Sequence, residues 1–247
     1  MPAARVLSGV QWGVDRVLSV GYGLIYDYIF ERFAPYQALR REVLEAVESA
    51  VPPGIERRDV RILDVGCGAG NFSLMLAEAG FTVVGLDAYD ALVTLAQEKR
   101  RAQRLMNLAF IHGMLTSEGP FPAEHFDQLI NVHFLYAHRD PIAMLHAAHR
   151  VLRPGGHAVF VNLTRRVSVS STFRELRQRA GIAAAIRSLL WVLPNSIFET
   201  VRRPIGPHYW DETEFGRHLR ETGFEILELR RTFFDGASLM ARVAKRV

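Results

Sequence analysis

The stretch from Val60 to Leu74, V-R-I-L-D-V-G-C-G-A-G-N-F-S-L, constrains the fold of this chain more than any other. A short apolar run ends at Asp64, three glycines follow at alternate positions, and an apolar pattern of helical period comes next. This order is typical of a buried parallel strand that enters a tight glycine turn and then a helix. Glycine permits positive φ angles and lets a ligand come close to the backbone. The first N–H groups of a helix have no hydrogen-bond partner within the helix. The stretch therefore predicts a strand–turn–helix unit whose turn is either ligand-binding or purely structural.

The spacing of the glycines at 66, 68 and 70 is G-x-G-x-G, with an acidic residue two positions ahead. It differs from the G-x-G-x-x-G turn of dinucleotide-binding folds. The motif resembles the nucleotide motif of class I S-adenosylmethionine-dependent methyltransferases. Further segments resemble that family's later motifs in the same order, and the resemblance spans residues 60–164 and 211–247. These segments are Phe81–Asp90, Phe126–His138, His149–Asn162 and Gly223–Thr232.

The resemblance implies an α/β, Rossmann-like fold with a seven-stranded, mostly parallel sheet and helices on both faces. The residues support this fold by themselves, because short strand patterns alternate with helical ones, as parallel strands with crossover helices require. The expected strands are Val60–Asp64, Thr82–Leu86, Leu108–His112, Asp127–Asn131 and His157–Leu163. The expected helices are Asn71–Ala79, Ala91–Arg104 and Pro141–Leu152. Asp64, Asp87, Gly113 and Asn131 then fall at strand carboxyl ends, where such sheets bind ligands.

Two segments lie outside this alternation and divide the chain into an arm, a core and an insertion. Residues 1–58 are expected to form a helical arm over the cleft, with a second helix from Pro35 to Ala50. Tyr26-Asp27 resembles the Tyr-Asp pair that many family members carry there, which implies that Tyr26 lies near the methionine end of the cofactor. The core comprises residues 59–164 and 211–247, and residues 165–210 are an insertion.

The insertion holds eight arginines and two glutamates, so its net charge of +6 exceeds the +4 of the whole chain. Its apolar stretch Ile182–Leu193 predicts a cap helix over an acceptor pocket. A helix on a membrane surface, with the arginines of residues 165–203 meeting anionic headgroups, is the second interpretation, and the cap is favoured because such insertions usually build the acceptor pocket. Both interpretations hold if the acceptor is a lipid.

Composition limits the remaining classes of protein. The 247 residues, 49% of them apolar, suffice for one such domain with a sizeable core. The single cysteine, Cys67, excludes an intramolecular disulfide and fits a reducing compartment. Charged residues interrupt the first twenty positions, and no run reaches the ~20 apolar residues of a membrane span. We therefore expect a cytoplasmic protein, with peripheral membrane contact left open.

The family resemblance implies S-adenosylmethionine as the cofactor and S-adenosylhomocysteine as the product. It places the methionine part on the backbone of the glycine loop, which runs through Gly66, Cys67, Gly68 and Gly70. Asp64 would help to hold the ammonium group. Asp87 would accept hydrogen bonds from the ribose diol, which its two carboxylate oxygens suit well.

The adenine end of the expected site departs from the family pattern. Family members usually carry Gly-Asp after the third strand, and the carboxylate takes the adenine amino group. Here the sequence is His112-Gly113-Met114, so the acid is missing. Backbone N–H groups and apolar surface of Met114 and Leu115 would contact the ring instead, with Ala88 on its other face. Asn131, at the end of the fourth strand, completes the expected cofactor site.

Methyl transfer from a sulfonium chiefly requires alignment of the nucleophile in a dry cleft. A base is needed when the acceptor is a hydroxyl or an acidic carbon. His133 and Tyr136 follow the fourth strand three residues apart, so a helical turn would put them on one face. By resemblance, His133 falls near the transferring methyl and Tyr136 falls where relatives often carry a histidine. His133 is thus either a base or a pocket wall. The nine histidines lack ligand spacing, so no metal is expected.

The acceptor remains the open part of the prediction. A dehydrogenase would need G-x-G-x-x-G, which is absent. A nucleic-acid amino-methyltransferase would typically carry two prolines after the fourth strand, where Asn131-Val132-His133-Phe134 stands, although the clustered arginines keep that class open. A non-catalytic cofactor-binding protein is a third alternative. The aromatic arm and apolar insertion favour O- or C-methylation of a hydrophobic or aromatic small molecule, with N-methylation open and no nucleic-acid partner expected.

Overall fold

The computed structural model describes residues 30–32, 34–164, 208–233 and 236–246, together with scattered positions between 173 and 189. Most of the predicted N-terminal arm, including Tyr26, and most of the insertion therefore lie outside the described residues. The predicted domain boundaries at 58, 164 and 210 remain predictions.

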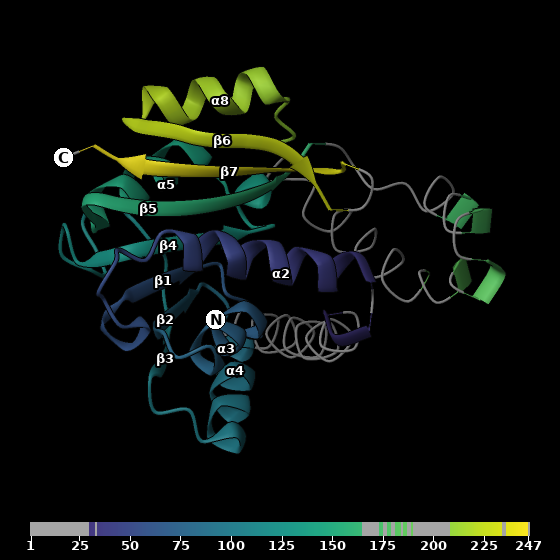
Figure 1. The fold of residues 1–247 in the computed structure, drawn as a ribbon, viewed down its shortest axis with the longest axis horizontal. Helices are drawn as coiled ribbons and strands as arrows, with labels where there is room; N and C mark the ends of the chain where they lie inside the picture. Colours follow the sequence, from purple (N-terminus) through teal and green to yellow (C-terminus); the bar gives the residue numbers. More distant parts are fainter. Residues whose placement is uncertain are drawn as a thin grey trace, which may run out of the picture.

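One seven-stranded sheet, with strand order β3-β2-β1-β4-β5-β7-β6, organises the described chain (Figure 1). Neighbouring strands from β3 to β5 run parallel, whereas β7 is antiparallel to both β5 and β6. The predicted Rossmann-like, mostly parallel α/β fold is confirmed. The strands are β1 (Arg61–Val65), β2 (Thr82–Asp87), β3 (Leu108–His112), β4 (Phe126–Val132), β5 (Leu152–Leu163), β6 (Phe224–Thr232) and β7 (Ser238–Lys245).

Helices cover both faces of the sheet and bury two separate apolar cores. Because successive strand residues point to opposite faces, Ile62 and Ile130 join one core while Leu63 and Leu129 join the other. The first core lies under α2 (Ala34–Ser49), α3 (Asn71–Glu78) and α4 (Asp90–Gln103). The second lies under α5 (Pro141–Val151) and α8 (Glu212–Glu221). The described residues also include two 3₁₀ turns, η1 (Arg57–Asp59) and η2 (Leu135–Ala137).

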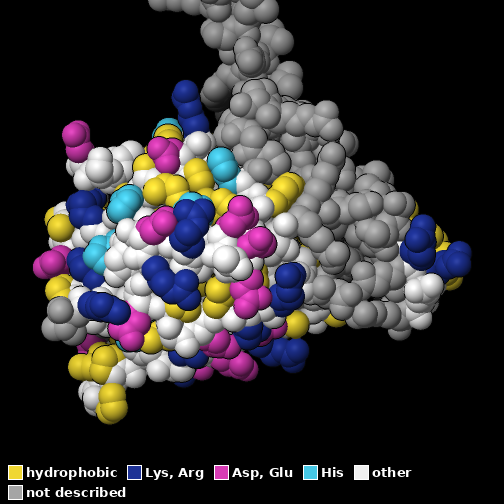
Figure 2. Space-filling model, turned by 90° about the horizontal axis from the view of Figure 1, so that it is seen from above, with side chains coloured by type: hydrophobic (Ala, Val, Ile, Leu, Met, Phe, Trp, Pro, Cys, Tyr) yellow, Lys and Arg dark blue, Asp and Glu magenta, His cyan; other side chains and the backbone are white. Residues whose placement is uncertain are grey.

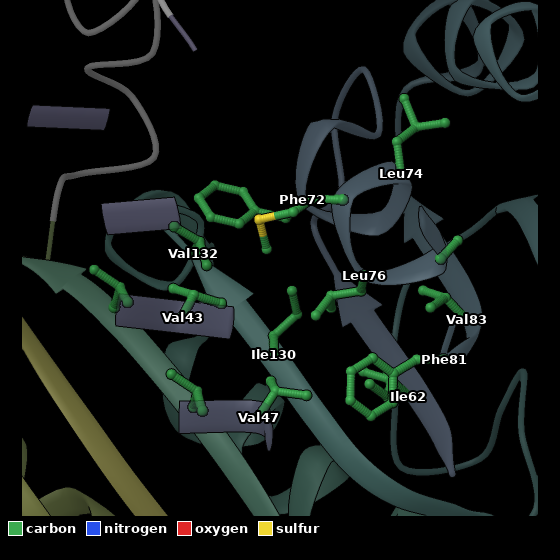
Figure 3. Packing of buried hydrophobic residues seen from close by; sticks show 14 of the residues in the cluster. Val43, Val47, Ile62, Phe72, Leu74, Leu76, Phe81, Val83, Ile130 and Val132 are labelled. Atoms are coloured by element: carbon green, nitrogen blue, oxygen red, sulfur yellow. The ribbon is translucent and has the colours of Figure 1, made fainter. Parts of the chain in front are cut away.

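Helix α2 crosses the sheet in front of β4 and is fastened to it by apolar and polar contacts (Figure 1). Val43 and Val47 pack beside Ile130 and Val132 of β4 (Figure 3). At the edge of the sheet, Glu42 Oε2 accepts hydrogen bonds from Arg230 Nη1 at 2.7 Å and from Thr232 Oγ1 at 2.6 Å. These contacts fix the middle and the second half of α2 on the sheet.

Most predicted elements occur within one or two residues of their expected bounds, including the helix predicted for Pro35–Ala50, which is α2. Strand β5 is the clear exception, because it begins at Leu152 and not at His157. Leu152 pairs with Phe126, and a register shift then separates this pair from Gln128 and His157. The Pro-Gly-Gly sequence within the strand forms this irregularity, which an alternation pattern does not reveal.

Candidate functional site

The glycine loop joins β1 to α3 in the predicted manner. The Gly66 and Cys67 N–H groups both donate to the Leu86 carbonyl of β2, at 2.8 and 3.1 Å. Gly66 has a φ of +75° and Gly70 a φ of +80°, which side chains other than that of glycine rarely adopt. A Cβ at Gly66 would lie 2.2 Å from Cγ of Phe134. The loop is therefore tightly enclosed at Gly66, where its shape requires glycine.

Asp87, the last residue of β2, contacts the glycine loop. Its side chain is only 4% exposed, and its Oδ2 accepts the Gly68 N–H at 2.8 Å while its Oδ1 accepts the Tyr89 N–H at 2.9 Å. Each carboxylate oxygen keeps a second lone pair, so these bonds are compatible with the predicted contact to a ribose diol. The structure thus places Asp87 against the glycine loop, at the edge of the expected nucleotide site.

Asp64 lies behind the loop at the end of β1 and is 2% exposed. Its Oδ2 accepts a hydrogen bond of 2.6 Å from Ser73 Oγ of α3. Burial, together with the nearby charge of Asp87, raises the pKa of Asp64 from 3.8 to about 7, although the Ser73 bond opposes the rise. A buried acid of this kind favours a cationic group beside it. Burial likewise raises the pKa of the Cys67 thiol well above its usual range, which agrees with a packing role for Cys67.

The predicted adenine side gathers Ala88, Met114 and Leu115 around the carboxyl ends of β2 and β3. Only about 10 Å³ of free space remains between these residues and Phe134, which is about the volume that one water molecule requires. A purine ring therefore requires a side chain to move outward, and Met114, which is 53% exposed, has the freedom to do so. Met114 and His138 also line a cavity of about 610 Å³ that extends to Trp210.

Asn131, at the end of β4, makes two hydrogen bonds within the protein. It is fully buried, its Nδ2 donates to the Val65 carbonyl at 2.7 Å, and its Oδ1 accepts the Leu135 N–H at 3.2 Å. Its amide therefore joins the end of β1 to the η2 turn. A direct contact between Asn131 and the cofactor stays a prediction, whereas its role in holding both loops is observed.

His133 and Tyr136 do not share a face, so that expectation was wrong. His133 has a φ of +55° and precedes η2, so the two residues are not on one continuous helical turn. The His133 ring contacts Tyr36 of α2 and Ser238 of β7. Tyr136 stacks on Tyr209 at 6.0 Å, and its carbonyl accepts the His208 N–H at 2.7 Å. Tyr136 belongs to the packing around residues 208–210, away from the His133 contacts.

The surroundings of His133 include residues that the sequence did not identify. Its Nε2 lies 2.8 Å from Ser238 Oγ and its Nδ1 lies 3.4 Å from the Tyr36 hydroxyl. Phe233 packs edge-to-face against the imidazole at 4.7 Å between ring centroids. Burial lowers the pKa of His133 from 6.5 to about 3, and no charged group contributes to this shift. No local signal could have found these partners, because they come from α2 and the C-terminal hairpin.

The arrangement fits S-adenosylmethionine in its main features. The buried acid Asp64 suits the ammonium group, Asp87 suits the ribose hydroxyls, and the glycine loop admits close approach of a backbone-bound ligand. At Gly68, which carries a positive φ of 54°, an added Cβ would meet nothing within 4 Å, so the loop faces open space there. A family model described as a methyltransferase domain matches residues 30–229, well over half of the chain. The chain belongs to the methyltransferase domain family.

Curated relatives of this methyltransferase match it over short stretches. The 23S rRNA (uracil(1939)-C(5))-methyltransferase RlmD of Shewanella sp. strain ANA-3 is 42% identical over 76 residues, which are 31% of this chain and 16% of the relative. The corresponding protein of Pectobacterium atrosepticum is 40% identical over 73 residues, 28% of this chain and 16% of the relative. The chain thus spans about a sixth of the length of these relatives, too little to transfer their substrate.

Solved structures resemble the methyltransferase along most of its length but at low identity. An S-adenosylmethionine-dependent methyltransferase from Aquifex aeolicus has a TM-score of 0.59 at 16% identity, covering 91% of this chain and 98% of its own. The CurJ carbon methyltransferase has a TM-score of 0.62 at 18% identity, covering 89% and 57%. The [4+2]-cyclase SpnF has a TM-score of 0.63 at 20% identity, covering 87% and 84%. These likenesses show the fold alone.

The predicted class, a class I S-adenosylmethionine-dependent methyltransferase, is confirmed by the family match and the shared fold, and S-adenosylmethionine is its cofactor. Within the part of the chain that the structure describes, no group of three or more His, Cys, Asp or Glu residues is arranged to hold a metal ion. None of the described helices is long and apolar enough to cross a bilayer.

Proposed function

We propose that the methyltransferase methylates a hydrophobic or aromatic small molecule, with an oxygen or carbon atom as the favoured acceptor. One observation carries the proposal: the half-buried His133 at the end of β4 is framed on one side by two aromatic rings, Tyr36 of α2 and Phe233, which directly follows β6. Tyr36 stands edge-on to the imidazole at 6.0 Å and 87°, and Phe233 packs against both rings, with centroids 4.7 Å from the imidazole and 4.8 Å from Tyr36. Such a frame suits a flat apolar molecule and offers little to a phosphate backbone.

The residues of the chain would divide the work by their chemistry. When bound, S-adenosylmethionine supplies a methyl group that is already activated by its sulfonium. Asp64 would hold the ammonium, Asp87 would hold the ribose, and the glycine loop would set the depth of the cofactor. Around His133, the aromatic rings would exclude water and orient the acceptor, which is the main requirement for an in-line displacement.

His133 would accept the acceptor's proton when the acceptor is a hydroxyl. Its pKa of about 3 keeps the imidazole neutral at physiological pH, so a lone pair is available. A base this weak suffices if the proton leaves as the O–CH₃ bond forms, because the methylated oxygen would otherwise be a strongly acidic oxonium ion. The cofactor would supply the methyl group together with its positive charge, and His133 would end with the acceptor's proton and that charge.

A transfer assay with S-adenosylmethionine that carries a tritiated methyl group tests this proposal. Phenols, hydroquinones and polyketide and terpenoid alcohols would be incubated singly with the enzyme and labelled cofactor, and organic-phase label would identify an acceptor. With a hydroxyl acceptor, His133→Ala and His133→Gln should each lower kcat by about 10²- to 10⁴-fold, while calorimetry shows unchanged cofactor affinity. His146→Ala, an exposed histidine of α5, is the matched control. Activity within tenfold of wild type in both His133 variants would leave the residue as a pocket wall.

The RlmD relatives motivate one alternative, which is methylation of RNA. The same assay with transcribed ribosomal RNA tests it, because label in the acid-precipitable fraction and none in the organic phase would replace the small-molecule proposal. The described face in Figure 2 shows Lys and Arg side chains interspersed with Asp and Glu, which gives that alternative little support. Absence of label in every fraction would favour the third alternative, a cofactor-binding protein without transfer activity.

We also propose a cytoplasmic protein whose basic insertion, residues 165–203, touches anionic membranes. The support is the sequence alone, since most of that segment lies outside the described residues. Flotation with vesicles containing phosphatidylglycerol should then recover the protein, and recovery should fall with salt. Equal recovery after replacement of the arginines in residues 165–203 by glutamine would remove the insertion from any membrane contact.

A further inference from the structure

Three side chains from distant parts of the chain form one hydrogen-bonded row at the end of β4. Ser238 Oγ lies 2.8 Å from His133 Nε2, and the Tyr36 hydroxyl lies 3.4 Å from His133 Nδ1. Ser238 is fully buried and Tyr36 is 2% exposed, whereas His133 keeps partial exposure. Both contacts therefore lie inside the protein, and the longer contact, to Tyr36, is the weaker of the two.

A neutral imidazole carries one proton, so one ring nitrogen donates and the other accepts. The phenol oxygen of Tyr36 shares its lone pairs with the ring, which makes it the better donor, while a serine oxygen accepts well. The consistent assignment has Nε2–H donating to Ser238 Oγ and the Tyr36 O–H donating to Nδ1. In that tautomer the Nδ1 lone pair is the basic position, and the bond it makes is the replaceable one.

We propose that Ser238 is a positioning residue, which holds His133 in the tautomer whose Nδ1 lone pair faces the acceptor. The Tyr36 hydroxyl occupies the place that an acceptor hydroxyl takes at Nδ1. This inference rests on the proposed role of His133 as the base, and it adds the residue that makes such a role feasible. It also explains why the imidazole is held at one nitrogen by a buried group with no charge.

Both ends of the short contact are anchored by backbone bonds. Ser238 opens β7, where it pairs with Leu163 of β5 and Thr232 of β6. The His133 N–H donates to the Val161 carbonyl of β5 at 2.8 Å, and the φ of +55° aims the ring toward β7. A positive φ in a residue other than glycine costs about 1 kcal/mol or more and persists where the surroundings enforce it. Strand register thus fixes the Ser238–His133 distance.

Among the described residues, the groups packed around His133 give the imidazole no charged partner. They are Tyr36 from α2, Phe233 at the end of β6 and Ser238 from β7, and the lowered pKa of His133 has burial as its only cause. Glu42 of α2 accepts its hydrogen bonds from Arg230 and Thr232, which join α2 to β6. The tautomer must therefore be set by hydrogen bonds, and Ser238 makes the shorter one.

Nitrogen-15 spectroscopy of the imidazole tests the proposal without any acceptor. Protein labelled at histidine would be studied near pH 7 by long-range proton–nitrogen correlation, and loss of one set of signals in His133→Gln would assign His133. The expected wild-type result is a protonated Nε2 and an unprotonated Nδ1. Ser238→Ala, which is nearly isosteric, should reduce the Nε2–H population at least twofold, whereas Tyr36→Phe should leave Nε2–H dominant.

Activity then provides a second measurement. With a hydroxyl acceptor, Ser238→Ala should lower kcat about tenfold to a hundredfold at unchanged cofactor affinity, as loss of a histidine's orienting partner does at metal sites, and Ser238→Thr should restore most of it. If threonine prevents folding, the spectroscopic comparison of Ser238→Ala with Tyr36→Phe carries the test. A wild-type Nδ1–H tautomer, or an unchanged tautomer in Ser238→Ala, would overturn the proposal. An Nε2–H tautomer in an enzyme whose His133 variants stay active would overturn only the proposed base.

Discussion

Replacing Asp64 by asparagine should remove a pH-dependent cost to stability that the fold imposes. Asp64 is 2% exposed, and its pKa rises from 3.8 to about 7 in the folded protein, first because burial penalises the carboxylate. When the pKa of an acid is higher in the folded state than in the unfolded state, its protonation stabilises the fold. That stabilisation is complete only at pH values below the pKa of the unfolded state. Between pH 3.8 and about pH 7 the folded state holds a proton that the unfolded state has lost, so stability falls with rising pH.

The size of this effect follows from the two pKa values. One pKa unit corresponds to about 1.4 kcal/mol, so the whole window amounts to about 4 kcal/mol. Most experiments reach only part of that window, and between pH 5 and pH 8 the expected loss is about 2 to 3 kcal/mol. Other titrating groups add their own pH dependence to both proteins. The informative quantity is therefore the difference between Asp64→Asn and wild type.

Urea denaturation at pH 5, 6, 7 and 8 measures that difference. The free energy of unfolding of Asp64→Asn relative to wild type should increase by about 2 to 3 kcal/mol from pH 5 to pH 8. Effects of the altered Ser73 hydrogen bond do not depend on pH and cancel in this comparison. Asp90→Asn, at the exposed start of α4, should show no such trend. A constant difference between Asp64→Asn and wild type would refute the raised pKa.

The same pKa predicts proton release when the cofactor binds. An ammonium group beside Asp64 would lower its pKa, so binding near pH 7 should release part of a proton to the buffer. Calorimetry in phosphate and in Tris should then give binding enthalpies that differ according to the buffers' ionisation enthalpies. That difference should vanish in Asp64→Asn. Equal enthalpies for the wild type in both buffers would separate Asp64 from the ammonium site.

Three further predictions concern the loop, the ribose contact and the position of α2. Gly66→Ala should abolish measurable cofactor binding, because it combines a φ of +75° with a 2.2 Å approach to the Phe134 ring, and Phe134→Ala should relieve only the steric part in a double variant measured by calorimetry. Asp87→Ala should weaken cofactor affinity by about 1.5 to 3 kcal/mol, whereas Asp90→Ala should leave it unchanged; wild-type affinity in Asp87→Ala would exclude the ribose contact. Glu42→Gln should lower the free energy of unfolding by about 1 kcal/mol at low salt and by less at 1 M salt, since the ion pair is partly exposed; a loss independent of salt would assign the effect to packing.

The local residue pattern alone was sufficient to predict the strands, helices and glycine turn around the site. The alternation of strand and helix patterns located α2, α3, α4 and α5 within one or two residues, because periods of 2 and 3.6 are properties of consecutive residues. The glycine turn and the acidic residues near it could likewise be predicted from the sequence. Parallel strands end at one edge of the sheet, so Asp64 and Asp87 had to lie close together once the strands were recognised.

Tertiary structure decided what those residues contact. Asn131 is fully buried and joins two loops, Phe134 covers the glycine turn, and the backbone at His133 separates it from Tyr136. The sequence could not show these outcomes, because a positive φ or an inward-facing amide leaves no periodic signature.

The row through His133 depends on the longest-range contacts. Tyr36 and Ser238 stand 97 and 105 residues away from His133 in the sequence. The packing of α2 on β4 and the antiparallel return of β7 beside β5 bring them within hydrogen-bond distance. Strand order and register determine that meeting, and neither is encoded in the residues next to His133. The sequence by itself determined that an imidazole, that of His133, follows β4. Only the fold decided that Tyr36 and Ser238 hold this imidazole in place.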